Sequence, residues 1–351
     1  MLSRRLFMAF ALAASPLFAV AQGGDGVAVV KPFWLSAAVE GGELAALAAW
    51  RGPNGQVLVV TTARAKHQLI AIDGITGVRA RMIGGEGSKA GQLSSPSGIA
   101  LWNDVALVSD RDNQRIQAFS LPFLKPMGAI TDSIVLVAPL GLALAPADSG
   151  RADLFVTNDM HLSTNEETHG DAFRRRVLRF RLTRMAGVVK GLLERFFGDT
   201  ADGGLLLTVD AIAADQDNES VVVADAAARD LNVYGFDGGF VDEFGHAQLV
   251  GTPAGIALYA CDKESGFWIV AEKHATRNRF HLFERASYKY RGAFALAGVV
   301  DTDGIALLPG KAGAMQGAFY ATTGGTKIAA VSFAAVLAAM KLPDPCAAAE
   351  R

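Results

Sequence analysis

The chain has 351 residues, of which 51% are hydrophobic and 19% are charged, and its formal net charge at pH 7 is −2. This composition is typical of a globular protein, and the near-neutral charge excludes an electrostatically driven nucleic-acid binder. The length alone would allow two domains, but the internal repeats described below indicate one.

The first residues predict an export signal. Arg4 and Arg5 precede an uncharged apolar stretch of about 15 residues from Leu6 to Val20, with small residues at Ala19–Ala21. This stretch is shorter than the ~20 residues of a membrane-spanning helix. The order at residues 3–7 resembles a twin-arginine signal, and an ordinary secretory signal is the alternative. We therefore expect a periplasmic or secreted mature chain without a membrane span.

A tetrapeptide similar to GIAL recurs along the chain. A blurred copy, LAAL, begins at Leu44, and clearer copies begin at Gly98, Gly141, Ala211, Gly255 and Gly304. Each copy is followed by an apolar run that ends in polar residues, such as VALVSD, and then by a second run such as RIQAF. Short runs rich in Val, Ile and Phe that are separated by Asn and Asp predict consecutive antiparallel strands.

The spacing of these copies predicts the fold. Successive copies are 43 residues apart from Gly98 to Gly141, 44 from Ala211 to Gly255 and 49 from Gly255 to Gly304. This period is typical of a propeller blade, and the 70-residue interval from Gly141 to Ala211 holds an insertion. We predict an all-β fold, a six-bladed β-propeller of four-stranded antiparallel blades, with a β-sandwich as the alternative.

The predicted organisation has four parts. Residues 1–21 form the signal, 22–43 a lead-in, 44–342 the propeller and 343–351 a C-terminal tail. Within the propeller range, Phe333–Leu342 is rich in helix-forming residues and stops before a proline, which predicts a short C-terminal helix. Cys261 and Cys346 would meet an oxidising compartment after export, but nothing in the sequence predicts that they pair.

The third repeat contains two features that could bind a ligand. The insertion Met160–Phe173 contains His161, His169 and acidic residues, yet their spacing fits no tight metal-ligand pattern and favours a polar surface loop. In the strand after it, Arg179 and Arg181 fall on one face. That basic face could bind phosphate, or it could keep a blade edge soluble.

The order of motifs resembles the β-propeller phytases, secreted calcium-dependent enzymes that remove phosphate from inositol phosphates. The resembling stretches are DVALVSDRDNQRIQAF, PLGLALAPADSGRADLFVTND and, as the most specific match, VDTDGIALLP at Val300–Pro309. The resemblance extends over nearly all of residues 44–342. The GIAL and VAD patterns are shared with six-bladed NHL-type propellers in general.

The resemblance to phytases implies a calcium-dependent site. Carboxylates at one end of the channel would hold Ca²⁺ ions, which neutralise phosphate and activate water. Asp301 and Asp303 match two aspartates of the family and would serve in catalysis and as metal ligands, and Asp225 and Asp210 would be further metal ligands. Two acidic positions of the family are lost, because Ala254 and the alanines after Asp225 stand in their places.

Basic residues would bind the phosphate groups of the substrate whose negative charge the Ca²⁺ ions leave uncompensated. The resemblance places Arg111, and Lys66 or Arg64, at basic positions of the family, and the basic face adds Arg179 as a candidate.

Three functions follow as hypotheses. The first is a divergent phosphomonoesterase that acts on phytate or related esters, with a small phosphorylated substrate. It predicts that the strand-end aspartates, including Asp110 and Asp159, meet at one channel mouth; the alternative role of these two is turn formation. The second is a non-catalytic periplasmic propeller that binds a partner protein, peptide or glycan. The third, an oxidoreductase or lactonase, has no cofactor signature to support it.

Overall fold

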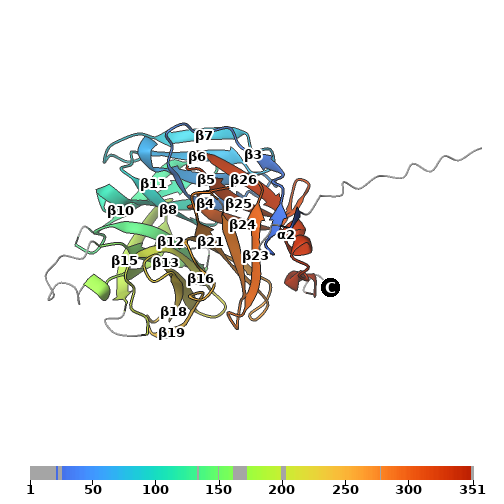
Figure 1. Cartoon of the computed structure of the whole chain (residues 1–351). Helices are drawn as coiled ribbons and strands as arrows, with labels where there is room; N and C mark the ends of the chain where they lie inside the picture. The colour runs from blue at the N-terminus through green and yellow to red at the C-terminus, as the bar shows by residue number, and fades with distance from the viewer. Residues whose placement is uncertain are drawn as a thin grey trace, which may run out of the picture.

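The computed structural model describes residues 21–22, 26–132, 134–148, 150–160, 172–198, 203–276 and 278–348. Residues 1–20, which make up nearly all of the expected signal, and residues 161–171 of the insertion lie outside the described residues. The described residues form six antiparallel sheets around a common centre (Figure 1). The predicted six-bladed β-propeller is therefore confirmed.

Each of the first five blades is built from four consecutive strands. Blade one contains β4 (Leu44–Arg51), β5 (Val57–Ala63), β6 (Gln68–Asp73) and β7 (Arg79–Gly84). Blade two contains β8 (Pro96–Trp102), β9 (Val105–Asp110), β10 (Arg115–Ser120) and β11 (Lys125–Thr131). Blade three contains β12 (Pro139–Pro146), β13 (Arg151–Asn158), β14 (Val177–Met185) and β15 (Val188–Phe197). Blade four contains β16 (Val209–Asp215), β17 (Ser220–Asp225), β18 (Asp230–Gly235) and β19 (Phe240–Phe244). Blade five contains β20 (Thr252–Ala260), β21 (Gly266–Lys273), β22 (Arg279–Glu284) and β23 (Tyr290–Leu296).

The sixth blade closes the ring with a strand from the start of the chain. Its strands β24 (Ile305–Ala312), β25 (Met315–Thr323) and β26 (Lys327–Ser332) are completed by β3 (Trp34–Leu35). β3 pairs antiparallel with β26, so hydrogen bonds between distant parts of the chain hold the ring shut. The segment 22–43 thus supplies part of the propeller, which the repeats alone did not indicate.

Further elements of both chain ends pack beside blade five (Figure 1). β2 (Ala28–Val30) pairs in parallel with β23, and β1 (Ala21–Gln22) pairs with β2. The helix α2 (Phe333–Ala339) buries Phe333, Val336 and Leu337 against blades five and six. The expected C-terminal helix is therefore present and ends three residues earlier than Leu342. A short 3-10 helix, η3 (Pro345–Ala348), follows it.

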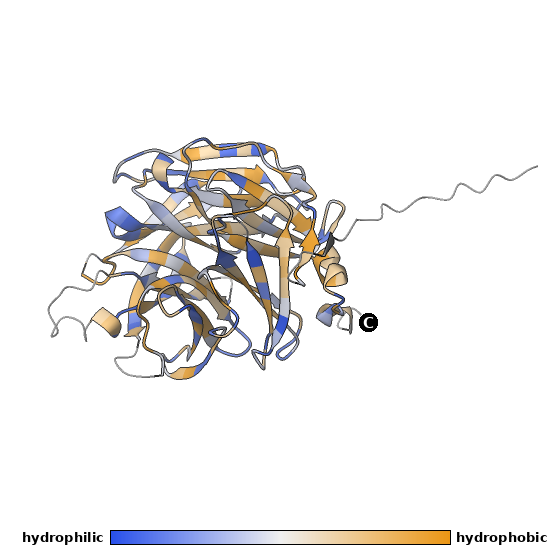
Figure 2. Cartoon of the chain, in the orientation of Figure 1, coloured by the Kyte–Doolittle hydropathy of each residue, from blue (hydrophilic) through white to orange (hydrophobic). Residues whose placement is uncertain are grey.

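The core lies between the blades. Hydrophobic residues follow the strands and α2 (Figure 2), and the buried side chains form clusters that each join neighbouring sheets. Between blades one and two, for example, Val60 and Leu69 pack with Val108 and Phe119, all four fully buried. No helix in the described part of the chain is long and apolar enough to cross a membrane.

The glycine of the GIAL repeat is required by close contact between innermost strands. A Cβ atom on Gly98 would lie 2.1 Å from the carbonyl oxygen of Leu140 in the next blade, and one on Gly141 would lie 2.4 Å from the carbonyl oxygen of Asp210. Hydroxyl groups of the second strands bridge the same contacts. Ser109 Oγ donates to Leu140 O at 2.6 Å, and Thr157 Oγ1 donates to Asp210 O at 2.8 Å. The glycine of the repeat therefore lies at the contact between one blade and the next.

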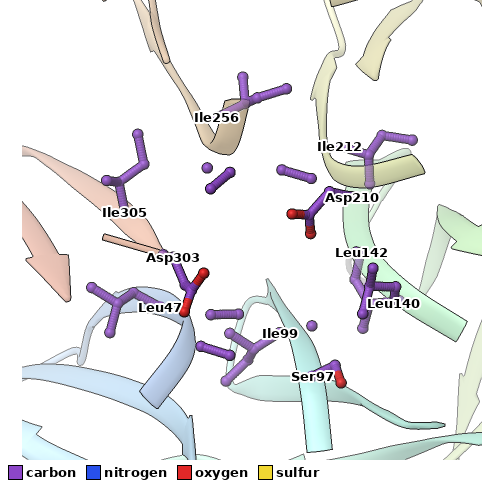
Figure 3. A pocket seen from close by; sticks show the side chains of 18 of the residues that line it. Leu47, Ser97, Ile99, Leu140, Leu142, Asp210, Ile212, Ile256, Asp303 and Ile305 are labelled. Carbon is purple, nitrogen blue, oxygen red and sulfur yellow. The ribbon is translucent and has the colours of Figure 1, made fainter. Parts of the chain in front are cut away.

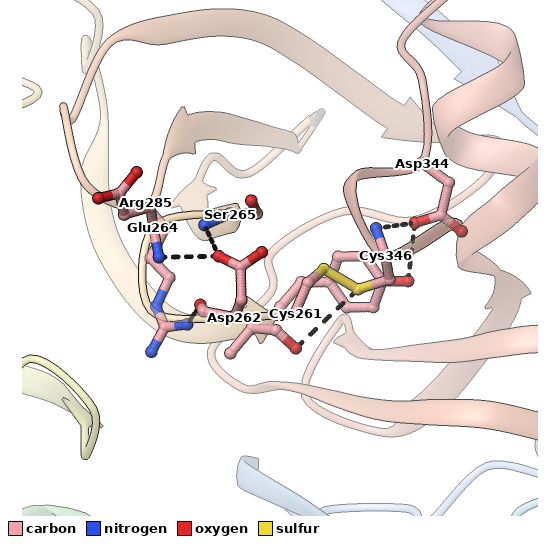
Figure 4. Close-up of a disulfide and its surroundings, with 9 residues drawn as sticks. Cys261, Asp262, Glu264, Ser265, Arg285, Asp344 and Cys346 are labelled. Carbon is pink, nitrogen blue, oxygen red and sulfur yellow. Dashed lines mark hydrogen bonds between the residues drawn. A yellow bond between two sulfur atoms is a disulfide. The ribbon is translucent and has the colours of Figure 1, made fainter. Parts of the chain in front are cut away.

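The two cysteines form a disulfide, which the sequence did not predict. The Cα atoms of Cys261 and Cys346 are 4.9 Å apart, and the bond ties the C-terminal segment to the turn between β20 and β21 (Figure 4). The hydroxyl group of Tyr259 also donates to Asp344 Oδ1 at 3.0 Å. This turn lies at the opposite end of the strands from the channel mouth described next.

Candidate functional site

One end of the central channel collects residues from equivalent positions of the blades. In each blade the residue directly after the second strand lies at this end, as do the residues that lead into the innermost strand. The residues after the second strands are Arg64, Arg111, Asp159, Ala226 and Gly324, and in blade five the sixth position is taken by Lys273, the last residue of β21. Five of the six, all except Gly324, line a cavity of about 540 Å³, which we call the channel mouth.

In blades two, three and four the last residue of the second strand has a different role from the residue after it. Asp110, Asn158 and Asp225 are fully buried. Their side-chain oxygens accept hydrogen bonds from backbone N–H groups of the preceding connection between blades, at Ser94, Ala138, and both Leu207 and Thr208. These residues hold the connections in place, which is the turn-forming role considered for Asp110 in the sequence.

Asp225 therefore lies apart from the predicted metal ligands. Its Oδ1 also accepts hydrogen bonds from the N–H groups of Ala227 and Ala228, at 2.9 and 3.1 Å, so four backbone donors occupy its carboxylate. It is absent from the lining of the mouth. Asp210 and Asp303, by contrast, do meet there, as the sequence predicted.

The carboxyl groups of Asp210 and Asp303 point into the channel from different blades (Figure 3). The backbone of Asp210 is held by the bond from Thr157, and Thr322 Oγ1 accepts the N–H of Asp303 at 3.0 Å. Below them the channel is lined by one aliphatic side chain from each blade: Leu47, Ile99, Leu142, Ile212, Ile256 and Ile305. A ligand in the mouth would thus contact polar groups above an apolar channel.

Burial raises the pKa of Asp210 to about 7. The positive charge of Arg64 acts in the opposite direction, and the negative charge of Asp303 adds to the rise. A carboxylate surrounded by protein lacks the hydration that stabilises its charge in water, so the neutral form is favoured. Near pH 7 Asp210 can therefore donate a proton or accept one.

Asp303 and Asp301 share the ammonium group of Lys273. Lys273 Nζ lies 2.6 Å from Asp303 Oδ1 and 3.5 Å from Asp301 Oδ1. Burial alone would lower the pKa of Lys273, but the hydrogen bond to Asp303 and the two negative charges raise it above its ordinary value. Lys273 thus remains charged and offsets one of the two negative charges of the pair on which the expected catalytic and metal roles rest.

Asp159 is likewise neutralised from within the protein. Arg176 is almost completely buried, and its Nη1 lies 3.6 Å from Asp159 Oδ1. The same guanidinium donates to the carbonyl groups of Met160 and Leu206, which fixes it against the connection between blades three and four. Asp159 therefore lines the mouth beside its own counter-charge.

Arg64 and Arg111 are the cations of the mouth whose charge is least balanced by ion pairs with neighbouring carboxylates. Arg64 forms no hydrogen bond or ion pair through its side chain with any described residue, although its Nε atom is buried. The guanidinium of Arg111 lies 3.7 Å from Asp112, whose side chain is about half exposed, so this ion pair is weakened by water. Both arginines lie where the sequence predicted substrate-binding groups.

Two further predicted substrate-binding residues lie elsewhere. Lys66 is exposed on the short 3-10 helix η1 (Arg64–Lys66) and does not line the mouth. Arg179 on β14 forms an ion pair with Asp153 at 2.8 Å and donates to the carbonyl group of Phe236. Its guanidinium therefore bonds within blade three and to blade four.

The residues present do not fit a calcium site. Calcium requires six to eight oxygen ligands. Among the described residues, no group of three or more histidines, cysteines or carboxylates lies close enough together to hold a metal ion. Asp301 and Asp303 contact the ammonium group of Lys273 instead of forming part of such a carboxylate cluster.

Lys273 is the site residue that the sequence did not single out. Its signal was its position, because it ends the second strand of the fifth repeat, whereas Arg64 and Arg111 directly follow those of the first and second. Arg176 had no comparable signal, since its role depends on carbonyl groups from a different blade.

Comparison with known proteins finds one NHL repeat in the chain and solved structures of similar fold. Residues 93–119, in blade two, match the NHL repeat. No curated protein matches. The similar solved structures include two of virginiamycin B lyase from Staphylococcus aureus. The selenomethionine-substituted enzyme has a TM-score of 0.51 at 11% identity, over 85% of this chain and 98% of that one. A catalytically inactive variant with quinupristin has a TM-score of 0.49 at the same identity and coverage.

At this identity the likeness shows the fold alone. The comparisons do not support the resemblance to phytases. The chain is a six-bladed β-propeller that carries an NHL repeat in its second blade.

Proposed function

We propose that this NHL propeller binds a small organic anion, a phosphate ester or a carboxylate, at the channel mouth through Arg64 and Arg111. The observation that supports this most is the state of Arg64, which lines the cavity without a side-chain partner among the described residues. A guanidinium that has lost part of its hydration gains strongly from a charged acceptor, and its planar donors suit phosphate and carboxylate groups.

The charge balance of the mouth favours the same ligand. Lys273 neutralises Asp303, and Arg176 neutralises Asp159. Asp210 is largely neutral below about pH 7 because of its raised pKa. The two arginines then supply the excess charge, and a concave site with uncompensated positive charge concentrates anions.

Calorimetry with phenyl phosphate and benzoate at pH 6 tests this proposal. We expect both to bind, and Arg64→Gln to weaken binding by roughly 10- to 100-fold, the loss of one hydrogen bond to a charged group. Arg79→Gln is the matched control, because Arg79 is exposed on the outer strand β7. Absence of binding, or equal binding by the Arg64 and Arg79 variants, would refute the proposal.

Phosphomonoester hydrolysis is a second candidate, and the raised pKa of Asp210 favours it. In this reaction a water oxygen would bond to phosphorus as the ester P–O bond breaks, and neutral Asp210 would give its proton to the departing alcohol oxygen. The attacking water would keep one proton on the phosphate product and release the other, which restores neutral Asp210. Asp301 and Asp303 would hold the side chain of Lys273 so that its ammonium group faces the phosphate. Release of phosphate from phenyl phosphate or phytate, lost in Asp210→Asn, would support it; no release with or without added calcium would remove it.

The alternative inferred from the sequence, a peptide ligand, is compatible with this site. A peptide would place its terminal carboxylate in the mouth, so benzoate in the experiment above also serves as a minimal probe for it.

We also propose that the protein acts in the periplasm or outside the cell. The signal-like sequence at residues 1–21 supports this, and so does the Cys261–Cys346 disulfide, because such bonds persist mainly in oxidising compartments. Cell fractionation of the full chain, with thiol labelling before and after reduction, tests it. A protein found in the cytoplasm with both thiols free would contradict it.

A further inference from the structure

Exposed aliphatic side chains stand on one half of the rim of the mouth. Ile134 and Val137 lie on the connection between blades two and three, Leu207 on the next connection and Val250 on the one after that. Their exposed fractions are 79%, 37%, 38% and 70%. Single exposed aliphatic residues are common on any protein, but four on three successive connections at one face are unusual.

Backbone contacts place these residues at the level of the mouth. The carbonyl group of Val137 accepts a hydrogen bond from Gln114, which follows the second strand of blade two. The N–H of Leu207 donates to Asp225 at the end of β17, and the carbonyl group of Val250 accepts from Arg229, just beyond it. Thr208 and Thr252, next to Leu207 and two residues from Val250, line the cavity itself.

The other half of the rim is polar. The remaining connections, residues 36–43, 85–95 and 297–303, carry no exposed large hydrophobic side chain among the described residues. They expose charged residues such as Glu40, Glu86 and Lys89 instead. Arg64 and Arg111 belong to blades one and two, on this polar side. The rim is therefore divided into a polar half, on the side of the two arginines, and an aliphatic half.

We infer that the ligand is an amphipathic anion, whose charged group contacts Arg64 and Arg111 while its aliphatic or aromatic part covers Leu207 and Val250. This inference rests on the proposed function and specifies its ligand class. A purely polar anion would leave the aliphatic half exposed to water, whereas an apolar tail beside the bound charge would cover it.

A series of monoalkyl phosphates tests the inference. Methyl, butyl and hexyl phosphate carry the same charge, so differences in affinity report on the alkyl chain. We expect the Kd measured by calorimetry to fall with chain length, by up to about fourfold for each methylene group that becomes buried, equivalent to about 0.8 kcal/mol. The Leu207→Ser/Val250→Ser double variant should lose this dependence and keep its affinity for methyl phosphate.

The controls separate this inference from the proposed function. Val241→Ser makes the same chemical change at a 60% exposed position on β19, away from the rim, and should behave as the wild type. If the double variant does not fold, Val250→Ser alone should lower the chain-length dependence. Equal affinity of wild type for methyl and hexyl phosphate would overturn the inference and leave the proposed function standing. No binding of any member would overturn both, and an unchanged chain-length dependence in the variants would overturn the inference.

Discussion

The ammonium group of Lys273 lies 2.6 Å from Oδ1 of Asp303, so a side chain of the protein stands where the resemblance to phytases implies a calcium ion. A lysine delivers one fixed positive charge without the oxygen ligands that a calcium ion requires. Lys273 therefore supplies positive charge beside Asp301 and Asp303 without a metal ion. This contact is one reason why we propose anion binding at the mouth in place of calcium binding.

Replacing Lys273 should expose the cation-binding capacity of the two aspartates. In Lys273→Met, Asp301 and Asp303 lose their counter-charge, and we expect measurable heat on titration with Ca²⁺ where the wild type gives little. Lys66→Met is the control, because Lys66 is an exposed lysine outside the mouth lining. Strong calcium binding by the wild type that Asp303→Asn abolishes would contradict this prediction and restore the metal site.

Anion binding should weaken as the pH rises through about 7. Asp210 has a pKa raised to about 7 in the folded protein, so it is neutral below that pH and adds a negative charge to the mouth above it. Benzenesulfonate is a suitable probe, because its own charge is constant between pH 5 and 9. Titration calorimetry should show a fall in affinity that Asp210→Asn removes and Asp242→Asn, at an exposed position on β19, does not.

The same group affects stability in a defined direction. Between about pH 4 and 7 the folded state retains the proton of Asp210 and the unfolded state has released it, so its contribution to stability falls as the pH rises across this window. The free energy of unfolding of Asp210→Asn should show a smaller decline there. A mutant with the same pH profile as the wild type would show that Asp210 titrates normally.

Thr157→Val should destabilise the protein and disturb the mouth. The fully buried hydroxyl group of Thr157 donates to Asp210 O and accepts from Gly141 N–H, at 2.8 and 2.7 Å. Valine has nearly the same shape but leaves both backbone groups without that partner, so we expect a loss of about 1–3 kcal/mol in urea denaturation. Thr131→Val, at an exposed position of β11, should change stability little. Equal effects of the two changes would argue against the bridge.

Breaking the disulfide should lower stability without altering the mouth. Cys346→Ser frees the C-terminal segment from the turn after β20, and loss of a native cross-link of this kind costs about 2–4 kcal/mol. Thermal denaturation measures this loss, and a reductant should lower the Tm of the wild type but not that of the variant. Anion affinity should be unchanged, because the disulfide lies at the far end of the strands. A fall in affinity would show coupling between the two ends.

The fold and part of the site were predictable because their signals are local and repeated. Each GIAL copy carries its own glycine and its own following strand, and the close approach at Gly98 and Gly141 makes that glycine necessary. Arg64 and Arg111 follow second strands in the same way, so the repeat alone brought them to one end of the channel. Asp210, the second residue of β16, and Asp303, two residues before β24, were proposed from the resemblance to phytases rather than from the repeat.

The tertiary structure decided which charges are free and which are engaged. Asp225 and Asp303 both lie beside strand ends in the sequence, yet backbone N–H groups occupy the first and Lys273 neutralises the second. The closing strand β3, the pairing of Cys261 with Cys346 and the bond from Arg176 to the next connection join residues far apart in the chain. The sequence alone determined the repeat and the ends of its strands, because a blade is stabilised by contacts along its own segment and with its neighbours. Which group pairs with each buried charge depends on the conformation of the connections and on closure of the ring. Both are established only when the blades assemble.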